Sequence, residues 1–305
     1  MTGLKLGSIS NTHFCDSWET SEHMPASVLD KLHATWPNLE LSVCCLNRID
    51  ARKPAHRQMD MKLLSSPLIR SLTYSVFFDS YRADEPAVSE WPRLTKALAV
   101  GGSVRKLRLQ GSPDSRYNTG GKILAEDESK AMLQLAINPG MQFSALEELT
   151  LRGQSYSYLW DITHCELLRD TLDWSRLRKL DFGNEMPEVF FATMKGRLPK
   201  LQALRFGVPY NTQSVGTIKR FIESLDNLTA LDIIQAGFVI AELWPSIMKH
   251  KKNLKELLLR PTIGSYCSHE CMDLAYLKRV ATDFPSLERL GWDAPCFSSV
   301  SELLH

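Results

Sequence analysis

One short motif recurs nine times along the 305-residue chain and constrains its fold more than any other feature. The motif is an apolar residue, two variable residues, Leu, one variable residue and a second apolar residue. Consecutive copies begin 33, 35, 42, 31, 24, 27, 26 and 33 residues apart. Intervals of this size are typical of stacked supersecondary units. The copies are Trp36/Leu39/Leu41, Ile69/Leu72/Tyr74, Val104/Leu107/Leu109, Leu146/Leu149/Leu151, Leu177/Leu180/Phe182, Leu201/Leu204/Phe206, Leu228/Leu231/Ile233, Leu254/Leu257/Leu259 and Leu287/Leu290/Trp292.

Each copy predicts a short strand, and the residues between copies predict helices. The last two apolar residues of a copy are two positions apart, so they share one face of a strand. Between copies, apolar residues follow helical spacing over 28–33, 189–194, 218–225, 243–248 and 274–281. Pro187 indicates a helix start, and Pro245 indicates a break or kink.

Stacking of these units predicts an α/β solenoid of about nine repeats. One strand and one helix cannot bury their apolar faces alone, whereas stacked neighbours can. The expected result is a parallel sheet on the concave side and helices on the convex side. A doubly wound sheet also alternates strands and helices, but its strands are near-continuous apolar runs. The strands here carry polar residues at alternate positions, which favours the solenoid.

The motif resembles the leucine-rich repeat, and its irregular spacing is similar to that of fungal F-box-like proteins. The phrase His33-Ala34-Thr35-Trp36-Pro37-Asn38-Leu39-Glu40-Leu41 is similar to one that opens their arrays. The resemblance covers roughly residues 25–294 and implies a single solenoid domain over 25–305, including its caps. Residues 1–24 are expected to be disordered or loosely packed. The Asn or Cys that usually follows the motif is matched only by Cys44, so we expect an uneven horseshoe.

The same resemblance raises the question of an F-box. Residues 24–32, Met-Pro-Ala-Ser-Val-Leu-Asp-Lys-Leu, are similar to the opening of that module. The first repeat begins at Trp36, which leaves too little chain for its three helices. We therefore expect a helix that caps the array, and the resemblance implies a relative that lacks the N-terminal module.

Composition narrows the functional classes. The net charge is +1, from 36 basic and 35 acidic side chains, so no excess charge favours nucleic acid or an anionic membrane as partner. No apolar run approaches the roughly 18 residues of a membrane helix. Seven scattered cysteines and the absence of a secretory pattern predict a protein of the cytoplasm or nucleus. We also expect a monomer.

The chain offers little support for catalysis, a metal or a cofactor. Cys267, His269 and Cys271 form the densest group of metal-ligand types, but zinc needs further ligands at compatible spacing. Gly120-Gly121-Lys122 departs from a phosphate-binding loop because Arg116 replaces the first Gly and Ile123 follows the Lys. We therefore expect no enzyme, no metal and no cofactor.

The repeat register predicts which side chains line the concave face. Asp181, Arg205 and Asp232 occupy equivalent outward positions on successive strands, so they should form an alternating charge ladder about 4.8 Å apart. The alternative is a solvated face whose charges cancel. A modest basic zone is expected at Lys106, Arg108, Arg152 and Lys179, beside Glu148 and Asp181.

Two long loops should leave the third and fourth strands at the same edge. They carry Tyr117 in the first loop and Tyr156, Tyr158 and Trp160 in the second. Insertions in repeat arrays often form the binding face, and Tyr and Trp are enriched at interface hot spots. We predict a binding site for a protein client here, with packing of these rings beneath the next helix as the alternative. The resemblance implies substrate recognition within a ubiquitin ligase complex, and a scaffold role without a ligase link stays open.

Overall fold

Nine parallel strands form one sheet in which neighbours follow chain order. A computed structural model describes residues 24–45, 59–79, 88–113, 134–143, 145–152, 158–208, 214–234, 239–260 and 274–292. The segment 1–24, expected to be loosely packed, lies outside these residues apart from Met24. A short strand β3 (Val88–Ser89) pairs antiparallel with β2. The parallel strands are β1 (Leu41–Cys45), β2 (Ile69–Asp79), β4 (Lys106–Pro113), β5 (Glu148–Arg152), β6 (Lys179–Asp181), β7 (Ala203–Gly207), β8 (Ala230–Ile234), β9 (Glu256–Arg260) and β10 (Arg289–Trp292).

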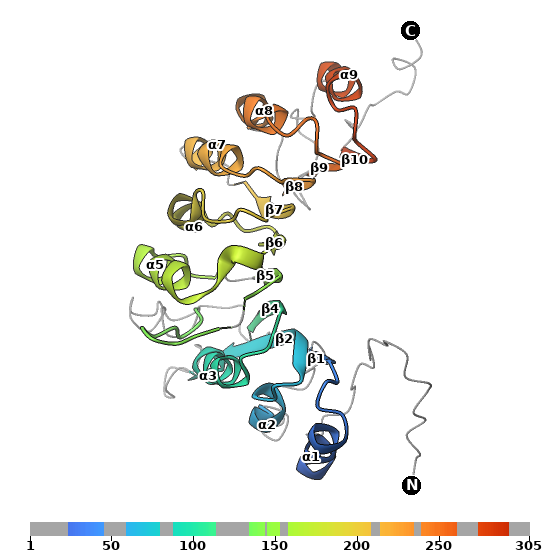
Figure 1. Cartoon of the computed structure of the whole chain (residues 1–305). Coiled ribbons are helices and arrows are strands. Elements are labelled where there is room, and N and C mark those ends of the chain that lie inside the picture. Colours follow the sequence, from blue (N-terminus) through green and yellow to red (C-terminus); the bar gives the residue numbers. More distant parts are fainter. Residues whose placement is uncertain are drawn as a thin grey trace.

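Helices form a second layer on one face of this sheet (Figure 1). The two layers curve together, with the strands on the inner side and the helices on the outer side (Figure 1). Among the described residues, no helix is long and apolar enough to cross a membrane. The helices are α1 (Ala26–Thr35), α2 (Met61–Leu64), α3 (Trp91–Gly101), α5 (Ile162–Thr171), the 3-10 turn η2 (Trp174–Arg176), α6 (Glu188–Met194), α7 (Val215–Glu223), α8 (Ile240–Met248) and α9 (Leu274–Asp283).

All five helices expected from apolar spacing are present. Pro187 caps the N-terminus of α6, as predicted. Helix α8 continues through Pro245 to Met248, so the predicted break is wrong there. The alternation of strands and helices around a parallel sheet confirms the α/β class.

The register aligns the motif leucines in one column across the sheet. Leu107 pairs with Leu149, and Leu149 pairs with Leu180. The first copy is the exception, because Val43 rather than Leu39 lies opposite Leu72. An irregularity between Leu41 and Ser42 shifts the pairing, so the repeat register predicted for this copy is wrong.

Backbone hydrogen bonds join successive units where each strand begins. The carbonyl of Arg105, for example, accepts from the amides of Glu147 at 2.7 Å and Glu148 at 3.1 Å. The same pattern recurs at each following unit, with Glu147, Arg178, Gln202, Thr229 and Lys255 as acceptors. The stack is therefore held at this edge by the main chain, which is independent of side-chain type.

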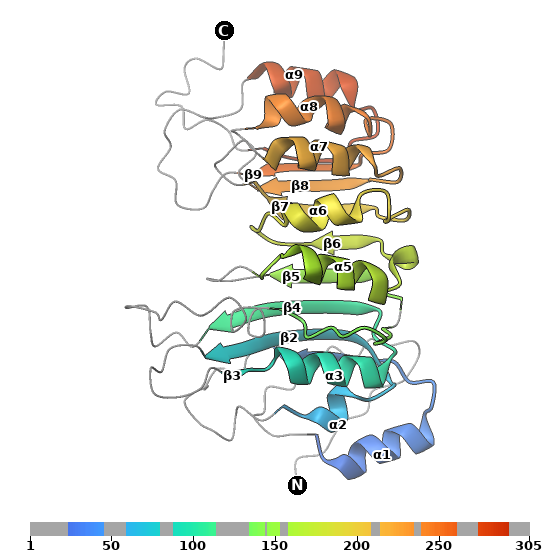
Figure 2. The same cartoon turned by 90° about the vertical axis from the view of Figure 1, so that its left-hand side faces the viewer.

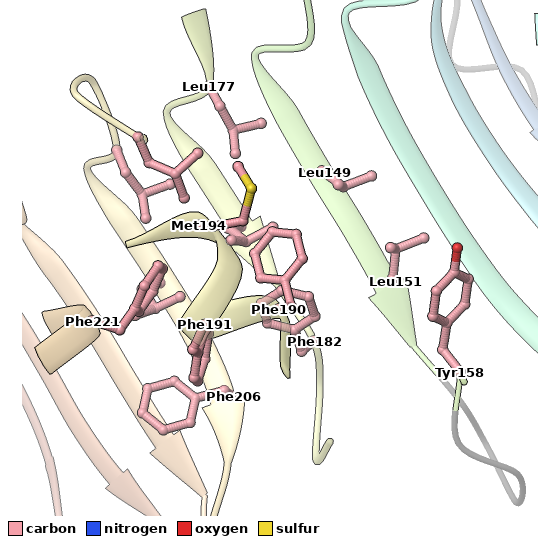
Figure 3. Packing of buried hydrophobic residues seen from close by; sticks show 14 of the residues in the cluster. Leu149, Leu151, Tyr158, Leu177, Phe182, Phe190, Phe191, Met194, Phe206 and Phe221 are labelled. Atoms are coloured by element: carbon pink, nitrogen blue, oxygen red, sulfur yellow. The ribbon is translucent and has the colours of Figure 1, made fainter. Parts of the chain in front are cut away.

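The core lies between the sheet and the helices, and aromatic rings fill its centre (Figure 3). Phe191 on α6 is fully buried and stacks on Phe221 of α7, with ring centroids 4.4 Å apart. It also meets Phe206 of β7 edge-on at 5.2 Å. One side chain thus connects two helices and the sheet.

We expect Phe191→Ala to lower the free energy of unfolding by about 3–5 kcal/mol, because it removes a buried ring and leaves a cavity between units. Urea unfolding followed by circular dichroism measures the change. The matched control is Val100→Ala on α3, where the side chain is 68% exposed and the expected change is below about 0.5 kcal/mol. Equal effects of the two substitutions would contradict this description of the core.

Candidate functional site

The inner face of the sheet carries an alternating row of arginine and aspartate side chains. Arg152 donates from Nε to Asp181 Oδ1 at 3.3 Å and from Nη2 to Oδ2. Arg205 Nε lies 3.9 Å from Asp181 Oδ1 and 3.5 Å from Asp232 Oδ2. Arg260 Nη2 lies 3.0 Å from Asp232 Oδ2. The predicted ladder of Asp181, Arg205 and Asp232 is confirmed and extends by one arginine at each end.

Strand register explains the ladder. Asp181 on β6 pairs with Arg205 on β7, which pairs with Asp232 on β8. Arg152 and Arg260 come from positions two residues further along their strands and reach the row diagonally. Adjacent parallel strands therefore bring opposite charges side by side without any contribution from a loop.

The two carboxyl groups of the ladder differ in their electrostatic environment. Burial tends to raise the pKa of Asp181, but hydrogen bonds from the Arg152 side chain and the Gly183 amide outweigh it and lower the pKa. The pKa of Asp232 is raised, because burial outweighs attraction to Arg260 and Arg205. The ladder thus holds one strongly stabilised carboxylate and one that is less well stabilised.

Half of the expected basic zone is neutralised by ion pairs. Lys106 pairs with Glu148 at 2.7 Å, and Arg152 is engaged by Asp181. Arg108 on β4 is exposed and Lys179 on β6 is half-buried, and neither has an ion-pair partner within the described part of the chain. The structure thus brings Arg108, Arg152 and Lys179 onto three neighbouring strands but leaves only two of these charges unpaired.

The exposed position predicted for Tyr158 and Trp160 is wrong, and the packing alternative is right. Tyr158 is 5% exposed and lies 4.5 Å from Trp160, centroid to centroid. Trp160 packs edge-on against Phe182 and Phe190 at 5.2 and 5.4 Å. Residues 158–160 therefore lie on the helix side of the sheet, just before α5. Tyr117 and Tyr156 lie outside the described residues, as do Cys267, His269 and Cys271.

Tyr158 instead anchors the connection between β4 and β5. Its hydroxyl accepts from the Leu135 amide at 3.0 Å and forms a hydrogen bond with His164 Nε2 at 2.7 Å. Its own amide donates to the Glu185 carboxylate at 3.1 Å. Burial lowers the pKa of His164 to about 4, partly opposed by attraction to Asp161. His164 is therefore neutral at neutral pH.

The described residues include a small apolar cavity but no cluster of metal-ligating side chains. They contain no group of three or more His, Cys, Asp or Glu side chains that could hold a metal ion. Burial raises the pKa of the Cys165 thiol to about 12, which removes its nucleophilic form at neutral pH. A cavity of about 20 Å³ beside Leu135 and Phe143 is lined by apolar side chains and has room for little more than one water molecule.

No protein-family model matches this chain, and a search of curated proteins finds no match to its sequence.

Loss of the buried carboxylate at Asp181 should destabilise the sheet. Asp181→Asn leaves Arg152 without its charged acceptor and weakens the bond to the Gly183 amide, so we expect the free energy of unfolding to fall by about 1–3 kcal/mol. The control is Glu148→Gln, which removes the exposed pair with Lys106 and should cost less than about 1 kcal/mol. Urea titration compares them, and a larger loss for Glu148→Gln would rule out the structural role of Asp181.

The buried His164 predicts a pH dependence of stability. Its pKa is about 4 when folded and about 6.5 when unfolded, so the unfolded state binds a proton over this interval and the folded state does not. Stability from this group is complete above pH 6.5 and falls as the pH drops toward 4, by about 3 kcal/mol in total. Burial also lowers the pKa of His250, which adds a decline of the same sign.

We expect His164→Gln to reduce this slope, because the amide can accept from Tyr158 without titrating. Urea unfolding at several pH values from 4 to 7 measures the slope in each protein. The His250 contribution should remain in the variant. An unchanged slope would show that His164 does not titrate differently in the folded and unfolded states.

Proposed function

We propose that this chain is a leucine-rich-repeat-like solenoid whose concave sheet face binds a protein partner. The fold assignment is supported by nine motif copies, by strands that pair in chain order and by helices on the outer layer (Figure 1). The register of the motif leucines from β2 to β10 supports equivalent units that differ in length.

The observation that carries the binding proposal is the ordered row of charges on the inner sheet face. The ladder from Arg152 to Arg260 fixes its side chains by mutual ion pairs. A partner therefore meets groups whose conformational entropy is already reduced. Arg108 and Lys179, which have no ion-pair partner among the described residues, are available to carboxylates of that partner.

The resemblance to fungal F-box-like proteins points to a cellular role for this surface. In that setting the array recognises the substrate of a ubiquitin ligase complex, as a monomer in the cytoplasm or nucleus and without enzymatic activity of its own. Attachment to the ligase adaptor would require an F-box module. A scaffold role remains the second candidate, because the ladder satisfies most of its own charges and leaves few for a partner.

Proximity labelling in the native cell tests the concave face. We expect Arg108→Glu/Lys179→Glu to reduce labelling of a defined set of proteins by about tenfold or more, since it reverses the two unpaired charges. The matched control is Arg93→Glu/Lys96→Glu on the outer helix α3, where both side chains are exposed. This control should leave labelling unchanged.

Two outcomes would decide against the proposal. Identical labelling by the wild type and the concave variant would favour the scaffold role, provided that both proteins are folded by circular dichroism. Equal losses in the concave and α3 variants would show a general effect of charge rather than a site. Co-precipitation of the ligase adaptor tests the ligase setting separately, and its failure would leave client binding untouched.

A further inference from the structure

Positive charge gathers along one edge of the array, where the helices lead into the strands. This edge is on the right of Figure 2. We define the basic rim as the connections into β6, β7, β8 and β9, residues 172–178, 195–202, 224–229 and 249–255. Within them lie nine Lys and Arg residues but only two acidic residues, although the whole chain is nearly neutral. The basic residues are Arg176, Arg178, Lys195, Arg197, Lys200, Lys249, Lys251, Lys252 and Lys255.

Pairing within the protein neutralises little of this charge. Lys249 lies 3.6 Å from Asp226, and Lys255 lies 2.8 Å from Glu288. The other seven have no ion-pair partner in the described part of the chain, and all seven are exposed. His250 adds no charge at neutral pH, because it is buried against the Ile222 carbonyl and burial lowers its pKa.

Helix stabilisation accounts for only part of the rim. Lys195 and Lys249 are the C-caps of α6 and α8, where a cation favourably meets the helix dipole. That effect fades within the last turn. Arg178, Lys200 and Lys252 lie beyond it, in the segments that enter the strands. Their charge therefore does not stabilise the end of a helix.

The rim is also held in place by hydrogen bonds between successive connections. The Gly196 amide donates to Ser224 Oγ at 3.1 Å, and Asn227 Nδ2 donates to the Pro199 carbonyl at 2.7 Å. Ser286 Oγ donates to the Lys252 carbonyl at 2.8 Å. The backbone beneath the charges is thus ordered before any partner arrives, which lowers the entropic cost of binding.

The chemistry of the rim distinguishes between classes of anionic partner. Its leucines are all buried, so no leucine side chain is available to enter a lipid bilayer. Its one Trp, Trp174, is 6% exposed and offers no surface on which a base could stack. Asp173 and Asp226 interrupt the positive charge and would repel a uniformly charged phosphate backbone. A peptide with spaced carboxylates fits this pattern best.

We propose that the basic rim is a second interaction surface, separate from the concave face, that binds an acidic segment of a partner protein. Exposed lysine and arginine side chains pair with Asp and Glu of that segment across several units. The interaction is electrostatic, so it weakens as salt shortens the Debye length below about 10 Å.

Fluorescence anisotropy with a fluorescein-labelled oligo-glutamate peptide tests the proposal on the full chain. We expect binding at low ionic strength, a loss of affinity with added salt and no binding of an oligo-glutamine peptide. The variant Lys195→Gln/Arg197→Gln/Lys251→Gln/Lys252→Gln should weaken binding by about tenfold or more, since four exposed pairs are removed.

A control with the same number of charge removals is Lys31→Gln/Arg93→Gln/Lys96→Gln/Lys278→Gln. These exposed residues lie on α1, α3 and α9, outside the rim. The control should change affinity by less than about threefold, which is the general effect of lower net charge. Thermal unfolding confirms that both variants are folded.

Absence of peptide binding at low salt would overturn the proposal, as would equal losses in the two variants. Tighter binding of duplex DNA or of phosphatidylserine vesicles than of the peptide would replace it with another class of partner. The rim variant keeps Arg108 and Lys179. Failure at the rim is therefore distinguishable from failure at the concave face.

Discussion

Parallel pairing of each strand with the next in the chain is the constraint on which the rest of this structure depends. From β2 to β10 the pairing places the motif leucines in one column and gives the units the same inner and outer faces. Main-chain bonds at the strand entries, such as those to the Arg105 carbonyl, need no particular side chain. Connections of unequal length can therefore be accommodated between units, because the register is fixed by the strands and not by the loops.

The same register distributes charge differently over the two accessible surfaces. On the inner sheet face, strands bring Asp181 and Asp232 beside arginines, and the charges largely cancel. At the strand-entry edge the connections meet side by side, and most of their lysines and arginines find no carboxylate. A chain with a net charge of only +1 thus presents one balanced face and one basic edge. Overall charge is consequently a poor guide to the electrostatics of this protein.

The aromatic residues after β5 stabilise the core, although their residue types are typical of binding surfaces. Tyr158 and Trp160 follow the end of a strand, and in the sequence they look like part of an exposed loop. In the structure both side chains pack against the core. The deciding partners are distant in the chain: the Leu135 amide, His164 and Glu185 each bond to Tyr158. These bonds satisfy polar groups that would otherwise be buried without partners, and they stabilise the described part of the connection between β4 and β5.

The sequence by itself determined the α/β class, the strands at eight of the nine motif copies, the five expected helices and the ladder of Asp181, Arg205 and Asp232. These features follow from the spacing of residues along the chain, because the period of a strand or helix decides which side chains share one face. Only the tertiary structure decided the shift of the first copy, the burial of Tyr158, the pairing of Arg152 with Asp181 and the basic rim. Each of these depends on which distant segments become neighbours, because burial and electrostatic pairing act through space and not along the sequence.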